Sequence, residues 1–480
     1  MEKKDTVIIG AGLVGSLLSI YLSKRGYNVK IFERRADMRK EKISAGRSIN
    51  LALSDRGIKA LEEVGIMEEI KKIAIPMHGR HIHNADGSTA YQPYGAEWQF
   101  INSVSRAELN KMLMDLAEQH GVEIAFNEKC ESINWQKDEI IFENTINHKL
   151  QTTNYELAFG SDGAFSAARL THQLQHDRFQ YQQYFIDYGY KELNIPAGVN
   201  AAFLMEKNAL HIWPRGNYML IALPNIDGSF TCTLFFPFEG VTSFATLDTK
   251  EKVRSFFEKT FKDAALLMPT LEEDFFNNPT GSLVTVKCFP WIREDKFALI
   301  GDAAHAIVPF FGQGMNCGFE DCRVLNGLID KHHNNWKLIL EEYQQLRKPD
   351  ADAIAELALN NFIEMRDKVA DPKFLLQKMI SKYERNEIVF SEKALEQIEK
   401  HAWNGNIREM ENRIERAVIL CDNNTISETD LDLEQIISFE NRDDIPLSDI
   451  EKITIEKVLA KHDYNISKSA EELGLSRAAL

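Results

Sequence analysis

The clearest pattern of apolar and polar positions lies near the N-terminus, between residues 6 and 33. An apolar run at residues 7–9 predicts a buried strand, and apolar residues at helical spacing over residues 13–22 predict an amphipathic helix. A second apolar run at residues 29–32 predicts another strand. Strand, helix and strand in this order are typical of a β-α-β unit in a parallel sheet.

The turn between the first strand and the helix carries a glycine pattern, Gly10, Gly12 and Gly15, which has the spacing G-x-G-x-x-G. Such glycines allow a tight turn, close approach of backbone to a pyrophosphate, and close packing of helix on strand. The second strand ends in Glu33, whose carboxylate can accept a hydrogen bond from a ribose hydroxyl. An ordinary glycine-rich turn is the alternative, but strand, helix and acid together favour a dinucleotide site.

Residues 103–121 predict an amphipathic helix with Ser105 as its N-cap and Glu108 three residues later. Arg106 then lies in the first helical turn, where the helix dipole disfavours a cation unless an anion is nearby. A cofactor phosphate or ribose would explain this position, and an ordinary surface arginine is the alternative. Residues 54–70 predict a further helix capped by Ser54.

Two more glycine turns follow predicted strands. One contains Gly160, Asp162 and Gly163, and the other follows the apolar run at residues 297–300 with Asp302 and then Gly314. Each turn lets backbone approach a ligand closely, although a purely structural loop would have the same spacing. Between them, aromatic and β-branched residues alternate over residues 180–237 and predict an antiparallel sheet that roofs a cavity.

The composition restricts the class of protein. A chain of 480 residues with 44% hydrophobic residues is long enough for two or three domains. Its net charge of −16 argues against a surface that holds nucleic acid by electrostatics alone. Neither a signal peptide nor an apolar run of membrane-spanning length is found, so we expect a soluble, cytoplasmic protein without a membrane partner.

Cysteine and histidine spacing does not predict a metal site. The six cysteines contain no C-x-x-C pair, and we expect them to be reduced thiols. His78, His81 and His83 suggest metal ligands, but no cysteine or carboxylate of suitable spacing accompanies them. We expect His81 and His83 to share one face of a strand and no metal to be bound.

The three glycine motifs together resemble those of the single-component flavoprotein aromatic hydroxylases. Within that family, six blocks resemble the branch that hydroxylates kynurenine. These blocks are GRSINLAL, GRHIH, QPYG, SRAELN, VPFFGQGMNCGFEDC and NNFIEMRDKVADPKFLLQK, and the resemblance covers residues 1–382. It implies an α/β fold with a Rossmann-like FAD-binding layer and an antiparallel-sheet substrate domain.

The resemblance also implies roles for individual residues. FAD would be held by Gly10, Gly12, Leu13, Val14, Gly15, Glu33, Arg34, Ala52, Arg106, Cys130, Asp162, Asp302, Gly314, Met315 and Asn316. Arg80, Tyr94 and Asn361 would bind the amino-acid end of the substrate, and Phe310, Phe311 and Gln313 would lie near its ring. Ala167 departs from the family, which often has a hydroxylated residue there. No catalytic acid or base is expected, because the flavin carries the chemistry.

The implied reaction is hydroxylation of L-kynurenine to 3-hydroxykynurenine. NADPH would reduce FAD, and O2 would give a flavin hydroperoxide whose distal oxygen the ring attacks. Two alternatives stay open: an aromatic hydroxylase with another substrate, and a DNA-binding regulator that uses the flavin domain as a sensor.

The chain changes character after residue 382, where an all-α appendage is predicted. Residues 383–440 contain HAWNGNIREMENRIERAVIL and resemble the AAA+ lid of NtrC-type activators, with Arg408 as the lid arginine. No G-x-x-x-x-G-K-[ST] loop accompanies the lid. Residues 441–480 resemble a truncated Fis-type helix-turn-helix whose recognition helix begins at Ser476. We do not expect specific DNA binding, and a homodimer is left open.

Overall fold

The computed structural model describes residues 4–40, 50–94, 99–363, 388–400, 413, 416–417 and 425–431. The chain divides into two compact units, Met1–Asp371 and Pro372–Leu480. Most of the predicted lid segment and all of the predicted helix-turn-helix lie outside the described residues. The mixed α/β fold predicted for the N-terminal part is confirmed.

A six-stranded sheet forms the centre of the first unit. The predicted β-α-β unit is present, because β1 pairs in parallel with β2 and helix α1 connects them. β1 also pairs in parallel with β12, which begins 148 residues later than the end of β1, and β12 pairs in parallel with β19. The strands in sheet order are β18 (Ile292–Arg293), β19 (Phe297–Leu299), β12 (Leu157–Gly160), β1 (Asp5–Ile9), β2 (Asn28–Glu33) and β8 (Glu123–Phe126).

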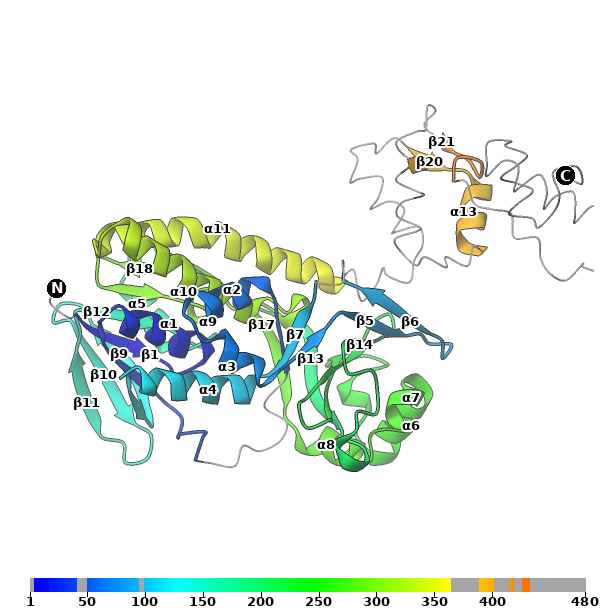
Figure 1. Ribbon diagram of the computed structural model, residues 1–480, viewed down its shortest axis with the longest axis horizontal. Helices are drawn as coiled ribbons and strands as arrows, with labels where there is room; N and C mark the ends of the chain where they lie inside the picture. Colours follow the sequence, from blue (N-terminus) through cyan, green and yellow to red (C-terminus); the bar gives the residue numbers. More distant parts are fainter. Residues whose placement is uncertain are drawn as a thin grey trace, which may run out of the picture. The chain divides into compact units, whose positions relative to one another are not determined.

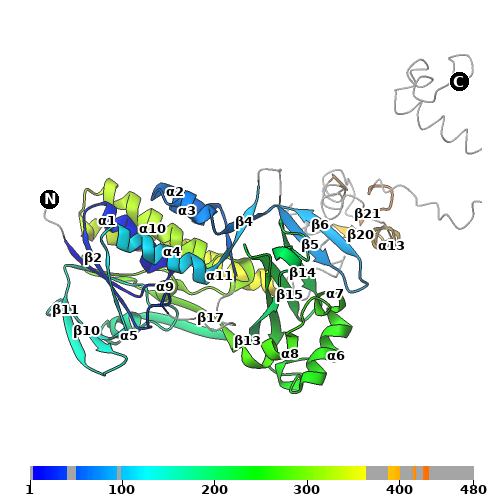
Figure 2. The same cartoon turned by 60° about the horizontal axis from the view of Figure 1, so that its bottom comes forward.

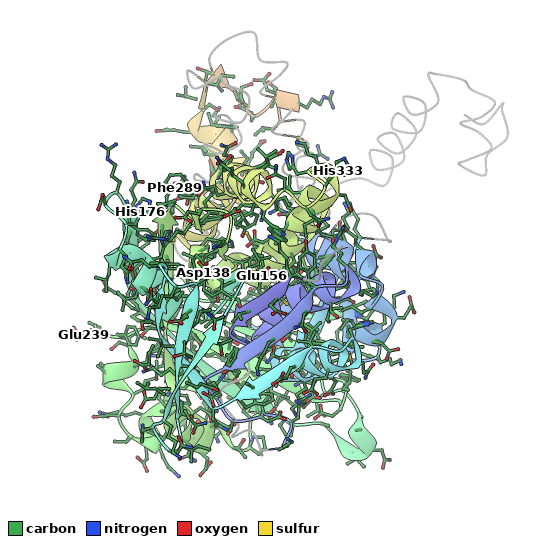
Figure 3. The ribbon with its side chains drawn as sticks, turned by 90° about the vertical axis from the view of Figure 1, so that its left-hand side faces the viewer. Asp138, Glu156, His176, Glu239, Phe289 and His333 are labelled. Atoms are coloured by element: carbon green, nitrogen blue, oxygen red, sulfur yellow. The ribbon has the colours of Figure 1, made fainter. Side chains whose placement is uncertain are left out.

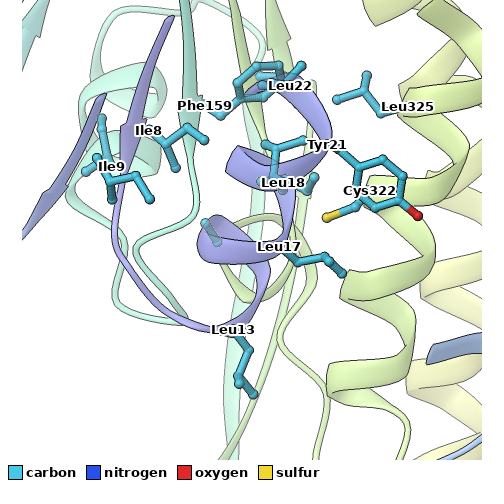
Figure 4. Packing of buried hydrophobic residues seen from close by; sticks show 14 of the residues in the cluster. Ile8, Ile9, Leu13, Leu17, Leu18, Tyr21, Leu22, Phe159, Cys322 and Leu325 are labelled. Carbon is cyan, nitrogen blue, oxygen red and sulfur yellow. The ribbon is translucent and has the colours of Figure 1, made fainter. Parts of the chain in front are cut away.

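Helices cover one face of this sheet and a small sheet covers the other. Helix α1 packs on α4 and α10, and Figure 4 shows its Leu18 and Tyr21 near Cys322 of α10. On the opposite face, Phe32 stacks on Phe142 of β10 with ring centroids 3.9 Å apart. The helices are α1 (Leu13–Lys24), α4 (Arg106–Gln119) and α10 (Gly314–Lys331), and the small antiparallel sheet is β9 (Glu128–Asn134), β10 (Glu139–Asn144) and β11 (Leu150–Asn154).

A seven-stranded sheet forms the other half of the first unit, and Figure 2 shows it together with three helices at the end opposite β9–β11. All neighbouring strands are antiparallel except β14 and β5. In sheet order the strands are β17 (Thr280–Phe289), β13 (Gln180–Ile195), β16 (Phe230–Pro237), β15 (Met219–Pro224), β14 (Ala209–Pro214), β5 (Gly79–His83) and β6 (Thr89–Pro93). Helices α6 (Lys250–Thr260), α7 (Lys262–Ala265) and α8 (Leu271–Asn277) pack on one face through a core of leucine and phenylalanine side chains.

The first unit contains one more small sheet and several further helices. This sheet is antiparallel and has the order β3, β7, β4, and the long helix α11 lies beside α10 (Figure 1). Their bounds are β3 (Asn50–Leu53), β7 (Ile101–Ser105), β4 (Ala74–Met77), α2 (Asp55–Glu63), α3 (Met67–Lys71), α5 (Ala167–Leu174), α9 (Asp302–His305) and α11 (Trp336–Ile363). Three short 3-10 turns span Val199–Ala201 (η1), Phe244–Thr246 (η2) and Pro309–Phe311 (η3).

Many charged side chains lie on the outside of the first unit, as Glu239 does at the left edge of Figure 3. This placement matches the acidic composition of the chain. Within the described ranges, no helix has the length and apolar character needed to cross a bilayer.

The described part of the second unit is small. Strands β20 (Val389–Phe390) and β21 (Thr425–Ile426) pair in parallel, and the Ser391 hydroxyl accepts a hydrogen bond from the Ala394 amide at the start of α13 (Glu392–Lys400). Ile426 of β21 is fully buried.

Candidate functional site

A cavity of about 600 Å³ lies in the first unit, where the carboxyl ends of the parallel strands face the seven-stranded sheet. Ligands of open α/β sheets bind at this edge of the strands. Most of the predicted residues line this cavity. They are Gly10, Gly12, Leu13, Val14, Glu33, Arg34, Ala52, Arg106, Cys130, Asp162, Asp302, Gly314 and Met315 from the cofactor set, and Arg80, Tyr94, Phe310 and Gln313 from the substrate set.

Two glycine turns lie back to back at one end of the cavity. Gly10 has φ +102°, and a Cβ there would lie 2.8 Å from the Ser161 carbonyl oxygen. The Ser161 hydroxyl lies within hydrogen-bond distance of the Ile9 and Gly10 carbonyl oxygens, at 2.9 and 3.0 Å. A side chain at Gly10 would therefore separate the turns, and glycine is required for this close approach.

Glu33 is buried at the end of β2 with both carboxylate oxygens engaged. One accepts from the Ala11 amide at 2.9 Å, and the other accepts from the Arg35 amide at 3.0 Å and from Arg35 Nε at 2.7 Å. Burial opposes ionisation, but the hydrogen bonds and charge of Arg35 outweigh it and lower the pKa of Glu33. The residue is thus an ionised acceptor that faces the cavity, as a ribose contact requires.

The second glycine turn is held by side chains of its own. Asp162 accepts from the Ser166 hydroxyl at 2.5 Å and from the Ala167 amide at 2.7 Å, so it caps helix α5. Burial raises the pKa of Asp162, and these hydrogen bonds oppose that effect. Buried Arg169 donates to the carbonyl oxygens of Ala303 and Ala164, at 2.8 and 2.6 Å, and so connects this turn to the Asp302 loop.

The loop that carries Asp302 is supported from behind by a buried ionic cluster. Asp321 accepts from the Gly301 amide at 3.1 Å and lies 2.6 Å from His305 Nε2 and 2.7 Å from Arg347 Nε. The three side chains come from α9, α10 and α11, and all are nearly inaccessible to solvent. The cluster thus fixes the position of Gly301 and of the loop that carries Asp302 after strand β19.

Two residues of the predicted cofactor set lie beside the cavity and do not line it. A Cβ at Gly15 would lie 2.1 Å from the Gly10 carbonyl oxygen, so Gly15 serves the packing of α1 on its turn. Asn316 is fully buried, its Oδ1 accepts from the Ser54 amide at 2.9 Å, and its Nδ2 donates to the Ala52 oxygen at 2.8 Å. Asn316 therefore positions the end of β3, which does line the cavity.

Positive charge gathers along one part of the cavity wall. Arg34, Arg35, Arg106 and Lys129 line it there. Arg106 is exposed at the first position of α4, and no ion pair is found for it among the described residues. A cation in a first helical turn is unfavourable without an anion, so this part of the cavity fits a phosphate-containing ligand. Cys130 also lines it, and burial raises the pKa of its thiol well above the usual range.

Arg80 and Tyr94 face the cavity from β5 and from the residue after β6. The Arg80 guanidinium carbon lies 5.6 Å from the centroid of the Tyr94 ring. Arg80 Nε and the Tyr94 hydroxyl are both buried and have no hydrogen-bond partner in the described part of the chain. Burial raises the pKa of Tyr94, and the Arg80 charge partly opposes this. Unpaired buried donors of this kind are costly unless a ligand pairs them.

The wall of the cavity includes side chains that the sequence patterns did not single out. Phe310 lies 5.1 Å from Phe235, ring centroid to centroid, and the sheet contributes alternate residues of three neighbouring strands. These sheet residues are Leu210, Ile212, Met219, Ile221, Leu223, Thr233 and Phe235. The alternation of side chains along a strand would have identified these residues if the pairing register of β14, β15 and β16 had been known. The side chains of Phe311 and Asn361 lie outside the described ones.

Three family models match successive parts of the chain. The FAD binding domain matches residues 3–358, the AAA+ ATPase lid domain matches residues 366–445, and the Fis family of bacterial regulatory proteins matches residues 446–480. The first match covers well over half of the chain.

Curated relatives match the N-terminal four-fifths. A protein named kynurenine 3-monooxygenase from Flavobacterium johnsoniae is 53% identical over 387 residues, which are 80% of this chain and 84% of the relative. Proteins of the same name from Myxococcus xanthus and Dictyostelium discoideum are 51% identical, over 79% of this chain and 82% of the relative, and 48% identical, over 78% and 84%.

Solved structures share the fold at low sequence identity. The tetrameric form of 2-methyl-3-hydroxypyridine-5-carboxylic acid oxygenase has a TM-score of 0.62 at 17% identity, covering 78% of this chain and 96% of that one. Tetracycline destructase Tet(51) has a TM-score of 0.55 at 19% identity, covering 81% and 99%.

Proposed function

Since the chain belongs to the family of FAD-dependent kynurenine 3-monooxygenases, we propose that it hydroxylates L-kynurenine to 3-hydroxykynurenine with NADPH and O2. One observation carries the substrate assignment. The same cavity is lined by the dinucleotide turn and by Arg80 and Tyr94, whose buried Nε and hydroxyl have no hydrogen-bond partner among the described residues. An amino acid with an aromatic ring supplies a carboxylate for these groups and an apolar body for the rest.

The residues present fit FAD. Backbone at Gly10 and Gly12 would approach the pyrophosphate, and Glu33 would accept a hydrogen bond from the ribose. The positive charge of Arg106, which is unfavourable in a first helical turn, would be balanced by a phosphate of the cofactor. Asp302 and the start of α10 would hold the other half of the cofactor. Bound FAD supplies the redox and oxygen-transfer chemistry.

The substrate's carboxylate would be bound by Arg80 and Tyr94. A guanidinium matches a carboxylate with two donors, and a phenol completes the pairing with one more. Asn361 is proposed as a third partner. Because Arg80 is fixed on a strand of the sheet, the aromatic ring at the far end of the substrate is oriented as well.

The chain's own contribution at the reacting ring would be to orient it and to exclude water. Phe310, Phe235 and Met219 supply apolar surface, and Gln313 is a polar side chain of the predicted set that also lines the cavity. No side chain is proposed as an acid or base. Exclusion of water matters because water at the reacting ring would favour the release of hydrogen peroxide over hydroxylation of the substrate.

The test is turnover by the purified chain. We expect yellow protein whose NADPH oxidation is accelerated by L-kynurenine and whose product is 3-hydroxykynurenine by chromatography and mass. Kynuramine, which lacks the carboxylate, is the matched control and should stimulate weakly. Turnover of a different phenol, with no 3-hydroxykynurenine formed, would replace this substrate by that of another aromatic hydroxylase.

A second candidate function is favoured by the Fis-family match at residues 446–480. A helix-turn-helix joined to a flavin domain could make a DNA-binding regulator whose flavin acts as a sensor. The acidic charge of the whole chain opposes it. DNA-binding measurements on the whole chain separate the two candidates.

A further inference from the structure

Three histidines meet on the face of the seven-stranded sheet that is turned away from the cavity. β5 and β14 are parallel neighbours in which His81 pairs with His211 and Arg80 pairs with Leu210. Because side chains alternate along a strand, Arg80 and Leu210 face the cavity while His81, His83 and His211 face the other side. One nitrogen of each ring lies within 4.8 Å of the others.

Two of the rings have one nitrogen committed to an acceptor. His83 Nδ1 lies 2.6 Å from Asp263 Oδ2, and His211 Nε2 lies 2.8 Å from the carbonyl oxygen of Glu206. The same Asp263 carboxylate also accepts from Trp213 Nε1 at 3.0 Å. A carbonyl oxygen and a carboxylate accept hydrogen bonds, so His83 Nδ1 and His211 Nε2 carry the ring hydrogens.

The other nitrogens of these rings then point lone pairs at each other. His83 Nε2 and His211 Nδ1 are 3.0 Å apart. A neutral imidazole has only one N–H, and both are already used, so this contact needs a cation between the rings. An extra proton would make it a hydrogen bond, and a metal ion would be bound by both lone pairs.

We propose that His81, His83 and His211 bind a divalent transition metal ion, with Zn²⁺ as the cognate ion. The third ring supports the metal over the proton, because His81 Nδ1 is also buried without a hydrogen-bond partner in the described structure. A shared proton engages two nitrogens and leaves this one unpaired. A metal ion can engage one nitrogen of each of the three rings.

The surroundings resemble those of protein zinc sites. Ligand histidines usually donate their second nitrogen to a carboxylate or a backbone carbonyl, as His83 and His211 do here. Tetrahedral Zn²⁺ with Zn–N bonds of about 2.0–2.1 Å places ligand nitrogens about 3.3 Å apart, so the 3.0 Å contact needs to open only slightly. His81 is half-buried, which leaves room for water as a fourth ligand.

The three imidazole ligands restrict which metal ions the site can bind. Three imidazoles without a thiolate suit Zn²⁺, Co²⁺, Ni²⁺ or Cu²⁺ and not Mg²⁺ or Ca²⁺. Arg215 donates to the His83 carbonyl oxygen at 2.8 Å, and its positive charge interacts with the Asp263 carboxylate. The ion would join β5 to β14 directly behind Arg80.

This site differs from the one that sequence spacing suggests. His78 precedes β5, and its ring lies 5.7 Å from that of Phe100, centroid to centroid. The third ligand is His211, which is 128 residues from His83 and becomes its neighbour only through the pairing of β14 with β5. The expectation that no metal is bound rested on ligands close in sequence.

The experiment measures metal on tag-free, FAD-loaded protein after chelator treatment and equilibrium dialysis against micromolar Zn²⁺. We expect one Zn²⁺ per chain in the wild type, with a rise in melting temperature on binding. Co²⁺ should give ligand-field bands beyond the flavin absorption. His81→Gln, at a half-buried position, should weaken binding at least ten-fold, and Asp263→Asn should weaken it by about 10- to 100-fold.

His78→Gln is the matched control and should bind Zn²⁺ as the wild type does. Absence of stoichiometric metal from wild-type protein would overturn the proposal and leave a shared proton. Binding that survives His81→Gln would also overturn it. Equal losses in His78→Gln and His81→Gln would do the same, because the ligands would then be those close in sequence.

Discussion

At the scale of single residues, the unpaired atoms of Arg80 and Tyr94 are the sharpest sign of a ligand. The fold buries both groups and gives Arg80 Nε and the Tyr94 hydroxyl no described partner. Other buried polar groups of the cavity, such as Glu33 and Asp162, already accept hydrogen bonds from the chain itself. Among the described residues, Arg80 Nε and the Tyr94 hydroxyl differ from these groups because only a bound molecule would pair them.

Arg80→Ala should raise the KM for L-kynurenine and leave FAD bound. The lost charge-assisted hydrogen bond contributes about 1.5–3 kcal/mol, or roughly a 10- to 100-fold rise in KM. Tyr94→Phe removes a neutral partner and should have a smaller effect in the same direction. Steady-state kinetics with the flavin content measured in parallel test this, and an unchanged KM in Arg80→Ala would remove Arg80 from the site.

Arg106→Ala should weaken FAD binding without lowering the stability of the apoprotein. The substitution removes a cation from a helix N-terminus, where it is unfavourable by itself, so the apoprotein should be as stable or slightly more stable. Loss of a charged contact to the cofactor should cost roughly ten-fold or more in affinity. Flavin titration and thermal unfolding of the apoprotein measure the two effects. A fall in apoprotein stability with unchanged FAD affinity would make Arg106 a structural residue.

Local sequence identified the turn residues but not the walls of the cavity. Gly10 and Glu33 lie within one β-α-β unit, so their spacing along the chain fixes their spacing in space. The sheet residues Met219 and Phe235 become neighbours only through the register of β15 and β16. Asn316 was expected beside the cofactor, and its partners at Ser54 and Ala52 are more than 260 residues away in the chain.

At the scale of elements, the cluster of His305, Asp321 and Arg347 joins three helices behind the Asp302 loop. Burial by itself would raise the pKa of Asp321, but His305 and Arg347 lower it. Burial by itself would lower the pKa of His305, but the Asp321 carboxylate raises it well above its usual range. Charged groups buried this deeply stabilise a fold only while all of them are paired.

The stability of the first unit should therefore decline as the pH rises above about 6.5, the pKa of unfolded histidine. His305 has a raised pKa in the folded state, so its contribution is complete below that pH and is lost as the pH rises through the folded-state pKa. Asp321 has a lowered pKa, so its contribution is present above about pH 4 and is lost as the pH falls through its folded-state pKa.

His305→Gln should remove the decline on the alkaline side, which has a limiting slope of about 1.4 kcal/mol per pH unit for one proton. Urea unfolding at a series of pH values, with FAD in excess, measures the slope. An identical slope in the wild type and in His305→Gln would show that His305 is neutral in the folded protein.

The N-caps of α4 and α2 differ in how far they can be predicted from the local sequence. Ser105 caps α4 as predicted, because its hydroxyl accepts from the Glu108 amide at 3.4 Å within the same turn. Ser54 lies at the N-cap position of α2 as predicted, but its side chain makes no capping bond. Its amide instead donates to Asn316. A capping contact within four residues is predictable, and a contact with a distant helix is not.

At the scale of the whole molecule, the chain joins an enzyme unit to a segment that matches regulatory families. We predict partial uncoupling of NADPH oxidation from hydroxylation. The flavoprotein family that the chain resembles continues beyond the shared region with further helix over the substrate, whereas residues 366–445 of this chain match the AAA+ lid domain. Water should then reach the site more readily and hydrogen peroxide should form. The ratio of 3-hydroxykynurenine to NADPH consumed measures this, and a ratio of one would show that another segment covers the site.

The appendage should not bind DNA specifically at physiological salt. Residues 441–480 contain more acidic than basic side chains, whereas affinity for DNA depends on neutralised phosphates. Fluorescence anisotropy of the whole chain with random and candidate promoter duplexes, at several salt concentrations, measures this. Saturable, sequence-selective binding at sub-micromolar concentration would instead favour the flavin-sensing regulator.

Strand β5 places Arg80 on one face of a sheet and His81 and His83 on the other. A one-residue insertion before Gly79 that shifts the register would exchange the faces, turning imidazoles into the cavity and the guanidinium out of it. A change in the length of β5 therefore affects both faces at once, whereas a substitution within β5 can alter either face alone. Descendants of this chain should vary in the residues of β5 long before they vary in its length.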